Sequence, residues 1–279
     1  MNRFLKLLHM EVSRFWKLYA AMFALTLLIQ GGGIMYESHK YMKQVEEKLG
    51  PGVTTYAEYV AEHGMTSFSN LMSAANLFIL APIALCIGGL ALYIFLIWYR
   101  EWTGKNMFIY RLLMLPTARR NMYLAKLSAI LLFVLGLVAL QLLILPLEYS
   151  LFNSIVDHDL RGAESLAEIT RSHTLFRTLI PLTFTQFVMY YGGGAIVVMV
   201  LFTAILLERS YRMKGIFAGL LYIGAACLLM MAPILITNRH GYDYLYPMEL
   251  FLIEFTIAIL IGAMSLAVSF FLMNKKISV

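Results

Sequence analysis

Charged residues are scarce in this chain of 279 residues, at 14% of the sequence, whereas hydrophobic residues make up 61%. Soluble domains carry about a quarter charged residues, so the composition indicates a membrane protein. In no part of the sequence does the charge density rise to that of a separate soluble domain. We therefore predict a single transmembrane domain over residues 1–279, although the length alone would allow two domains.

Cysteine and histidine are also sparse, and their positions argue against several kinds of chemistry. Cys86 and Cys227 lie in separate apolar runs, where we expect buried hydrophobic side chains rather than a disulfide or a metal pair. All six histidines lie outside these runs, which argues against haem ligation within the membrane. The sequence also lacks the H-E-x-x-H pattern of metalloproteases and the G-x-S-x-G elbow of serine hydrolases. We do not expect this chain to be an enzyme by itself.

Six apolar runs are each long enough to cross about 30 Å of hydrocarbon, which takes roughly 20 helical residues. They cover approximately residues 18–36, 73–99, 127–147, 180–207, 216–236 and 247–273. This pattern predicts an all-α polytopic membrane protein with six transmembrane helices. The basic, amphipathic residues 1–17 ahead of them are expected to form an interfacial helix. They carry too many charges for a signal peptide, so we expect them to remain uncleaved.

Basic residues are concentrated on one predicted side of the membrane. Fifteen of the 22 lysines and arginines lie in the amino terminus, in residues 100–126, in residues 208–215 and in the carboxyl tail. Most acidic residues lie in the outer loops, residues 37–72 and 148–178. Lysine and arginine are retained on the cytoplasmic side, so both termini are expected there. This topology accounts for the net charge of +6 without nucleic-acid binding.

Each of the two outer loops is predicted to contain short helices. In residues 37–72 a charged helix is followed by a second one, opened by Thr55 with Glu58 three positions later, which is the spacing of a capping box. In the other loop a short helix is expected around Gly162 to Ser172.

Two features within the predicted spans are candidates for function. Glu254 is an ionisable residue inside the sixth span, and such residues are costly in hydrocarbon. It is a candidate intramembrane polar site, although reaching the outer headgroups or pairing with a neighbouring span would also explain it. Gly192, Gly193 and Gly194 lie within the fourth span and form a candidate hinge, with close helix packing as the alternative.

Residues 100–126, "REWTGKNMFIYRLLMLPTARRNMYLAK", form a basic and partly apolar segment between the second and third spans. Glu101 and Thr103 suit the start of a helix, and Pro116 ends it. The expected helix either lies among the lipid headgroups or docks into a groove of another protein.

This segment resembles the region between the second and third spans of ABC-2-type permeases, the membrane subunits of type-2 ABC exporters. In that family the segment is the coupling helix, which docks on a separate ATPase subunit. The residues that match the pattern are Glu101, Gly104, Leu112, Leu113, Pro116, Arg119 and Lys126. The basic amphipathic start of the chain resembles the connecting helix that leads into the first span of the same family. The short connection between the fifth and sixth spans is similar to that of small Gram-positive permeases that export peptides or antibiotics or confer immunity to them.

The resemblance implies two ATPase subunits and a second permease copy or paralogue as partners, in a bacterial cell membrane. The sequence has no Walker A motif, so ATP and Mg²⁺ are expected in the partner subunits and no cofactor in this chain. The implied function is export of a peptide, an antibiotic or a lipid-like substrate. Two alternatives are a membrane sensor or scaffold protein, and a secondary transporter that uses Glu254.

Overall fold

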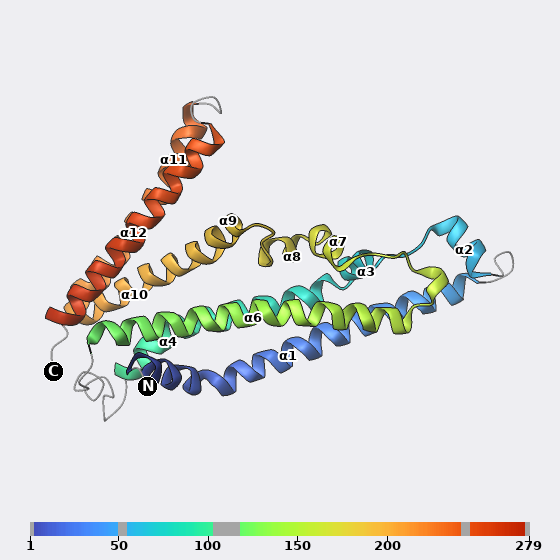
Figure 1. The fold of residues 1–279 in the computed structure, drawn as a ribbon, viewed down its shortest axis with the longest axis horizontal. Helices are drawn as coiled ribbons and strands as arrows, with labels where there is room; N and C mark the ends of the chain where they lie inside the picture. Colours follow the sequence, from blue (N-terminus) through green and yellow to red (C-terminus); the bar gives the residue numbers. More distant parts are fainter. Residues whose placement is uncertain (1–2, 50–54, 103–117, 241–245, 277–279) are drawn as a thin grey trace. The chain divides into compact units, whose positions relative to one another are not determined.

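The structure, a computed structural model, describes residues 3–49, 55–102, 118–240 and 246–276, and it is all-α (Figure 1). Six of its helical segments are long and apolar enough to cross a membrane. They are Arg3–Lys48, Asn76–Trp102, Arg119–Ile155, Phe184–Tyr211, Met213–Thr237 and Met248–Lys275. The chain is therefore a polytopic helical membrane protein, and the predicted fold class is confirmed.

The helices of these segments differ in their bounds from the apolar runs that predicted them: most extend beyond the run, while the second and fourth segments begin three and four residues later than predicted. The long helices are α1 (Arg3–Lys48), α4 (Asn76–Trp102), α6 (Arg119–Ile155), α10 (Gly193–Tyr211), α11 (Met213–His240) and α12 (Pro247–Lys275). The largest difference is in α1, which is continuous from residue 3 to residue 48. The expected interfacial helix, the first span and the charged helix after it are thus one helix, because polar residues continue a helix that hydropathy alone would end.

Four short helices lie in the two predicted outer loops, and the first three of them begin at side-chain caps. They are α2 (Tyr56–His63), α3 (Phe68–Ala74), α7 (Leu166–Ser172) and α8 (Thr174–Leu179). The backbone N–H of Glu58 donates to Thr55 Oγ1 over 3.4 Å, so Thr55 caps α2 as its sequence spacing predicts. In α7, Ser165 and Glu168 form a reciprocal capping box. Both predicted loop helices are therefore present.

The described chain divides into two compact units. Unit 2 comprises residues 14–90 and 132–182, and unit 1 comprises residues 1–13, 91–131 and 183–279. The helices α1, α4 and α6 each contribute a segment to both units.

In unit 2, α1 and α4 pack closely. Thr26 Oγ1 and Cys86 Sγ are 3.5 Å apart, and Gln30 Nε2 donates to the carbonyl of Ile79 over 3.3 Å. Gly33 makes the closest approach, because a Cβ at this position would overlap the Phe78 side chain. Small residues at such contacts let helix backbones approach within a membrane. Cys86 is buried as expected, whereas Cys227 of α11 in unit 1 is exposed, which corrects the expectation that both are buried.

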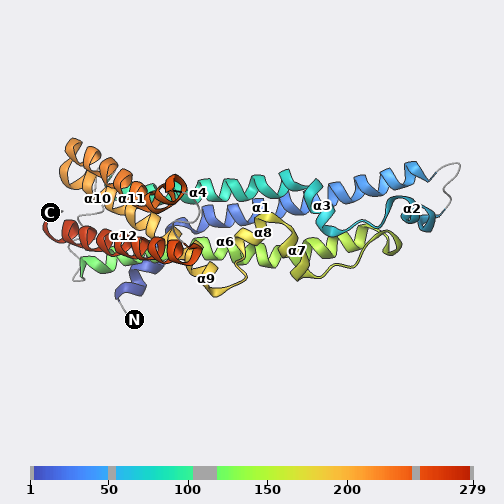
Figure 2. The same ribbon diagram turned by 90° about the horizontal axis from the view of Figure 1, so that it is seen from above.

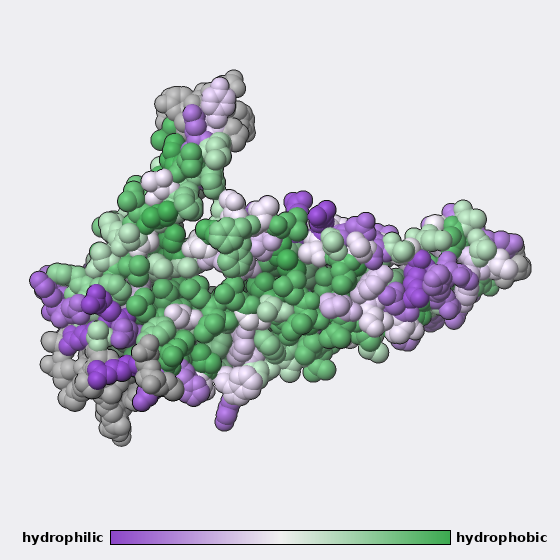
Figure 3. Space-filling view, viewed as in Figure 1, coloured by the Kyte–Doolittle hydropathy of each residue, from purple (hydrophilic) through white to green (hydrophobic). Residues whose placement is uncertain are grey.

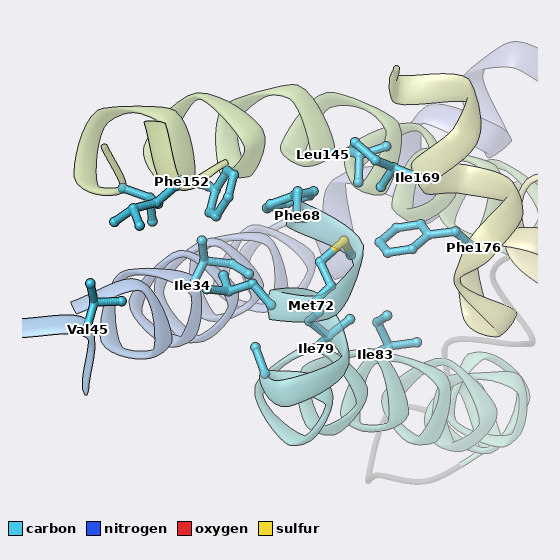
Figure 4. Packing of buried hydrophobic residues seen from close by; sticks show 14 of the residues in the cluster. Ile34, Val45, Phe68, Met72, Ile79, Ile83, Leu145, Phe152, Ile169 and Phe176 are labelled. Carbon is cyan, nitrogen blue, oxygen red and sulfur yellow. The ribbon is translucent and has the colours of Figure 1, made fainter. Parts of the chain in front are cut away.

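An apolar core joins the short helices of unit 2 to α1, α4 and α6 (Figure 4). Phe68 and Met72 of α3 are fully buried and point toward Ile34 of α1, Phe152 of α6 and Phe176 of α8. The rings of Phe68 and Phe152 lie 5.5 Å apart. We call this cluster, which includes Ile34, Phe68, Met72, Ile79, Phe152, Ile169 and Phe176, the outer core. Burial of these side chains holds the short helices against the ends of the spans.

In unit 1, α10, α11 and α12 pack against one another. In Figure 1, α10 meets α12 near the end of α12 and diverges from it toward α9, and Figure 2 shows the same helices from above. Thr203 of α10 donates to the carbonyl of Ser265 over 3.1 Å, and its Oγ1 is 2.9 Å from Ser269 Oγ of α12. Such hydroxyl bonds are typical of helix contacts in membranes. The Phe202 ring of α10 also lies edge-on to Trp98 of α4 and Tyr123 of α6, at 5.4 and 5.5 Å.

The surface of the long helices is apolar, as a lipid-facing surface requires. Figure 3 shows hydrophobic side chains along these helices, and hydrophilic ones around α2 in unit 2 and near the end of α12 in unit 1. The helix α11 is the most exposed of the spans, with Phe217, Leu220, Leu221 and Leu228 all uncovered.

Candidate functional site

A cluster of four charges, three of them buried, lies in unit 1, where α4 ends and α6 begins. We call it the ionic cluster; its members are Glu11, Arg100, Glu101 and Lys126. At its centre, Lys126 Nζ lies 2.8 Å from a carboxylate oxygen of Glu11 and 2.8 Å from one of Glu101. Lys126 is 0% exposed, Glu101 1% and Glu11 2%. Three helices, α1, α4 and α6, therefore meet at a single ammonium group.

The ammonium group of Lys126 is well matched to its surroundings. Besides the two carboxylates, it donates to the carbonyl of Ile97 over 2.9 Å and lies 5.1 Å from the centre of the Trp98 ring. Arg100 reaches the second oxygen of Glu11 at 3.3 Å, so two cations balance two carboxylates. Buried charges require such pairing, because desolvation of an unpaired ion costs several kcal/mol. The cluster therefore fixes a specific arrangement of the three helices.

The ionic cluster flanks the segment that was predicted to be a coupling helix. Glu101 lies two residues before the start of residues 103–117, and Lys126 lies seven residues after the start of α6, which follows them. Of the predicted docking residues, Gly104, Leu112, Leu113 and Pro116 lie outside the described residues. The structure thus describes both flanks of the segment, and the docking role itself stays a prediction.

Further contacts gather other helix ends of unit 1 beside this segment. Arg119, the first residue of α6, donates to the carbonyl of Met273 near the end of α12 over 2.6 Å. Tyr99 near the end of α4 donates to the carboxylate of Glu208 near the end of α10. The guanidinium of Arg209 lies 4.5 Å from the centre of the Tyr99 ring. The starts of α1 and α6 and the ends of α4, α10 and α12 consequently lie at one end of unit 1, as six spans with both termini on one side require.

A pocket of about 270 Å³ lies elsewhere in unit 1, between the start of the fourth span and α11 and α12. Glu254 lines it together with Gly192 and Gly193, so the predicted polar site and two of the predicted hinge glycines meet there. Gly194 does not line this pocket. The other lining residues are Val188, Met189, Ile196, Met230, Phe251, Phe255, Ala258 and Ile259.

The backbone beside this pocket departs from α-helical geometry. The short helix α9 (Phe184–Phe187) leads into η2, a π-helical segment over Val188–Gly192, before α10 begins at Gly193. π-helical turns are rare overall, and those that occur are often found at functional sites. The π-helical segment lies at the glycines that were predicted to form a hinge. Bending of the span at this hinge stays a prediction.

Two members of the ionic cluster, Glu11 and Arg100, are absent from the residues that the sequence singled out. Glu11 pairs with Arg100 and with Lys126, which lie 89 and 115 positions away from it in the sequence. Local periodicity in the sequence does not reveal contacts over such separations. One signal was present, because Glu11 is the only acidic residue among the first 36. Its position in a basic, apolar helix indicates a cationic partner.

Neither a metal-binding cluster among the described residues nor similarity to a known protein assigns a function to the chain. Across the described ranges, no three histidine, cysteine or acidic side chains lie together so as to hold a metal ion. Comparison with models of protein families, with curated proteins and with solved structures finds no match.

Proposed function

We propose that this chain is the membrane permease subunit of an ATP-binding-cassette exporter in a bacterial cell membrane. Two separate ATPase subunits bind and hydrolyse ATP, and a second permease copy or paralogue completes the translocation pathway. The substrate is a peptide, an antibiotic or a lipid-like molecule. Both termini and residues 103–116 face the cytoplasm in this proposal, because fifteen of the 22 basic residues lie in the corresponding segments.

The observation that carries the proposal is the ionic cluster on both flanks of residues 103–116. Glu101 and Lys126, which match the ABC-2-type pattern at either end of the segment, form a buried ion pair. A coupling helix needs rigid attachment to the spans, because a docking force would otherwise be absorbed by bending at its ends. The buried Glu101–Lys126–Glu11 contacts supply such an attachment to α4, α6 and α1.

Transmission of force follows from this attachment. Closure of the ATPase subunits would displace residues 103–116, and α4 and α6 would move with them. The Arg119–Met273 contact would extend the movement to α12. Coupling requires that residues 103–116 bind the two ATPase states with different affinity, since equal affinity shifts no equilibrium.

A charged double substitution tests the proposal. Leu112→Glu with Leu113→Glu, introduced into the tagged chain and purified together with its ATPase partners, should abolish stimulation of ATP hydrolysis by the permease. Membrane insertion and elution in size-exclusion chromatography should remain normal. Lys214→Glu is the control, since it alters an exposed charge in the loop region predicted to face the same side. Full activity of the double variant would refute the coupling role.

A further inference from the structure

The Glu254 pocket has an unusual composition for a membrane span. Of its described lining residues, Glu254 is the only ionisable one, and the remainder are apolar side chains and two glycines. Glu254 lies seven residues beyond the first residue of α12, about 10 Å along the helix at 1.5 Å per residue. The carboxylate is therefore one to two turns inside the span, at a depth where an ionised group is costly.

No described side chain compensates the charge of Glu254. The structure gives it no hydrogen bond and no ion pair within the described residues, whereas the neighbouring Glu249 accepts from the backbone N–H of Tyr246 over 3.0 Å. Glu249 serves the start of the helix, and Glu254 has no such structural role. A half-buried carboxylate in an apolar pocket favours a bound cation, because attraction between opposite charges is strong where water is excluded.

The apolar lining residues of the pocket determine which kind of molecule can carry the bound cation. The rings of Phe251 and Phe255 lie 5.9 Å apart and nearly parallel on the same wall as Glu254. Aromatic faces attract cations and also pack against alkyl chains. Ile196, Met230 and Ile259 provide further apolar contact. The volume of about 270 Å³ is slightly below the roughly 300–1,000 Å³ of sites that enclose a whole drug-sized ligand, so one end of a longer molecule fits here.

We infer that this pocket binds the cationic end of an amphiphile, with the cation at Glu254 and the apolar body along Ile196, Met230 and Phe255. The glycines of the opposite wall leave the room for it. A Cβ at Gly193 would meet no atom within 4 Å, and one at Gly192 would meet only Val188, at 3.8 Å. This inference goes beyond the proposed function, because binding requires no ATPase partner.

Equilibrium dialysis of the purified full-length chain in a nonionic maltoside detergent tests the inference. The probe is radiolabelled dodecyltrimethylammonium, and 1-dodecanol is the uncharged probe of equal chain length. We expect saturable binding of the cation to the unmodified chain, with affinity at least ten-fold above that for dodecanol. Glu254→Gln should remove this ten-fold preference and leave dodecanol binding unchanged. Glu62→Gln, which removes an exposed carboxylate of unit 2, should bind like the unmodified chain.

A second variant separates the pocket from the charge. Ala258→Phe places a ring in the pocket and leaves Glu254 in place, so it should weaken binding of both probes. Size-exclusion chromatography verifies that each variant is folded. The inference is overturned if Glu254→Gln binds the cation as tightly as the unmodified chain, if dodecanol binds equally well, or if no saturable binding occurs. None of these results bears on whether an ATPase binds residues 103–116.

Discussion

The ionic cluster of unit 1 and the outer core of unit 2 hold helices together by opposite means. Lys126 is as completely buried as Met72, but its neighbours include two carboxylates and a carbonyl, whereas Met72 belongs to a cluster of buried hydrophobic side chains. An apolar core tolerates substitutions that keep its volume. A buried ion cluster depends on each partner, since loss of one leaves another charge unpaired. We conclude that the outer core stabilises unit 2, and that the ionic cluster specifies one arrangement of α1, α4 and α6.

The largest expected effect is that of removing the central cation. Lys126→Met leaves the carboxylates of Glu11 and Glu101 buried without their shared partner, and should destabilise unit 1 by about 3–5 kcal/mol. A lower midpoint of thermal unfolding of the purified chain measures the loss. Lys214→Met, which removes an exposed lysine, should leave the midpoint nearly unchanged.

A rescue variant shows whether unpaired charge is the cause. Adding Glu101→Gln to Lys126→Met removes one of the two carboxylates, so that Arg100 and Glu11 again balance each other, and should recover part of the stability. If this double variant were less stable than Lys126→Met alone, lost packing rather than unpaired charge would explain the effect.

The outer core should respond to lost volume rather than to lost charge. Met72→Ala removes a fully buried side chain and should cost about 2–5 kcal/mol through lost burial and the cavity that remains. Met65→Ala changes the same residue type at a position of unit 2 that is 58% exposed, and should cost little. Unfolding midpoints of the two variants provide the comparison. Equal midpoints would show that the outer core does not hold unit 2 together.

A smaller effect is expected where α1 and α4 approach each other in unit 2. Gly33→Ala places a methyl group on the Phe78 side chain, so the helices must separate, at a cost of about 1–3 kcal/mol. Gly31→Ala is the matched control, because a Cβ there meets no atom within 4 Å. The control should be neutral or slightly stabilising, since alanine favours a helix more than glycine does. Unfolding midpoints that rank the two variants in the reverse order would contradict the close contact.

The smallest effect concerns pH and the segment between α7 and α8. Burial lowers the pKa of His173, whose ring packs against Phe176 at 5.5 Å. The unfolded segment gains a proton as the pH falls through about 6.5, and the folded one gains it only at lower pH. Stability of α7 and α8 should therefore be greatest above this pH and should decrease below it.

Hydrogen exchange of α7 and α8 at several pH values, corrected for the intrinsic pH dependence of exchange, measures this decrease. His173→Gln should abolish it, and His158→Gln, at an exposed histidine, should preserve it. A pH response that survives His173→Gln would assign the effect to another group.

The sequence was sufficient to predict the six spans, because each requires a long apolar run that few other structures need. It underestimated the length of four of them, whereas the second and fourth segments have the predicted length at shifted positions. Lys48 ends α1 twelve residues beyond the end of the predicted span, since a helix continues through polar residues wherever its backbone remains hydrogen-bonded. The helix α2 was predicted from Thr55, because caps are local signals. A helix was also expected around Gly162 to Ser172, but the cap that starts it, Ser165, was not recognised in the sequence.

The candidate site was only partly predictable. Glu101 and Lys126 were found through family resemblance, and Glu254 through its cost in hydrocarbon. The partners Glu11 and Arg100 were missed, since their contacts arise only when distant segments pack. The meeting of Glu254 with Gly192 and Gly193 likewise depends on how α12 packs beside η2 and α10, which hydropathy does not encode.

The most direct test of the central claim is to find what binds residues 103–116. The chain, tagged at its carboxyl tail, is extracted from native membranes in a mild detergent, and co-purifying proteins are identified by mass spectrometry. Our account predicts a stoichiometric soluble protein that carries G-x-x-x-x-G-K-[ST]. Purification of the chain alone or with a kinase, under conditions where a known ABC complex stays intact, would contradict it and favour a sensor or scaffold.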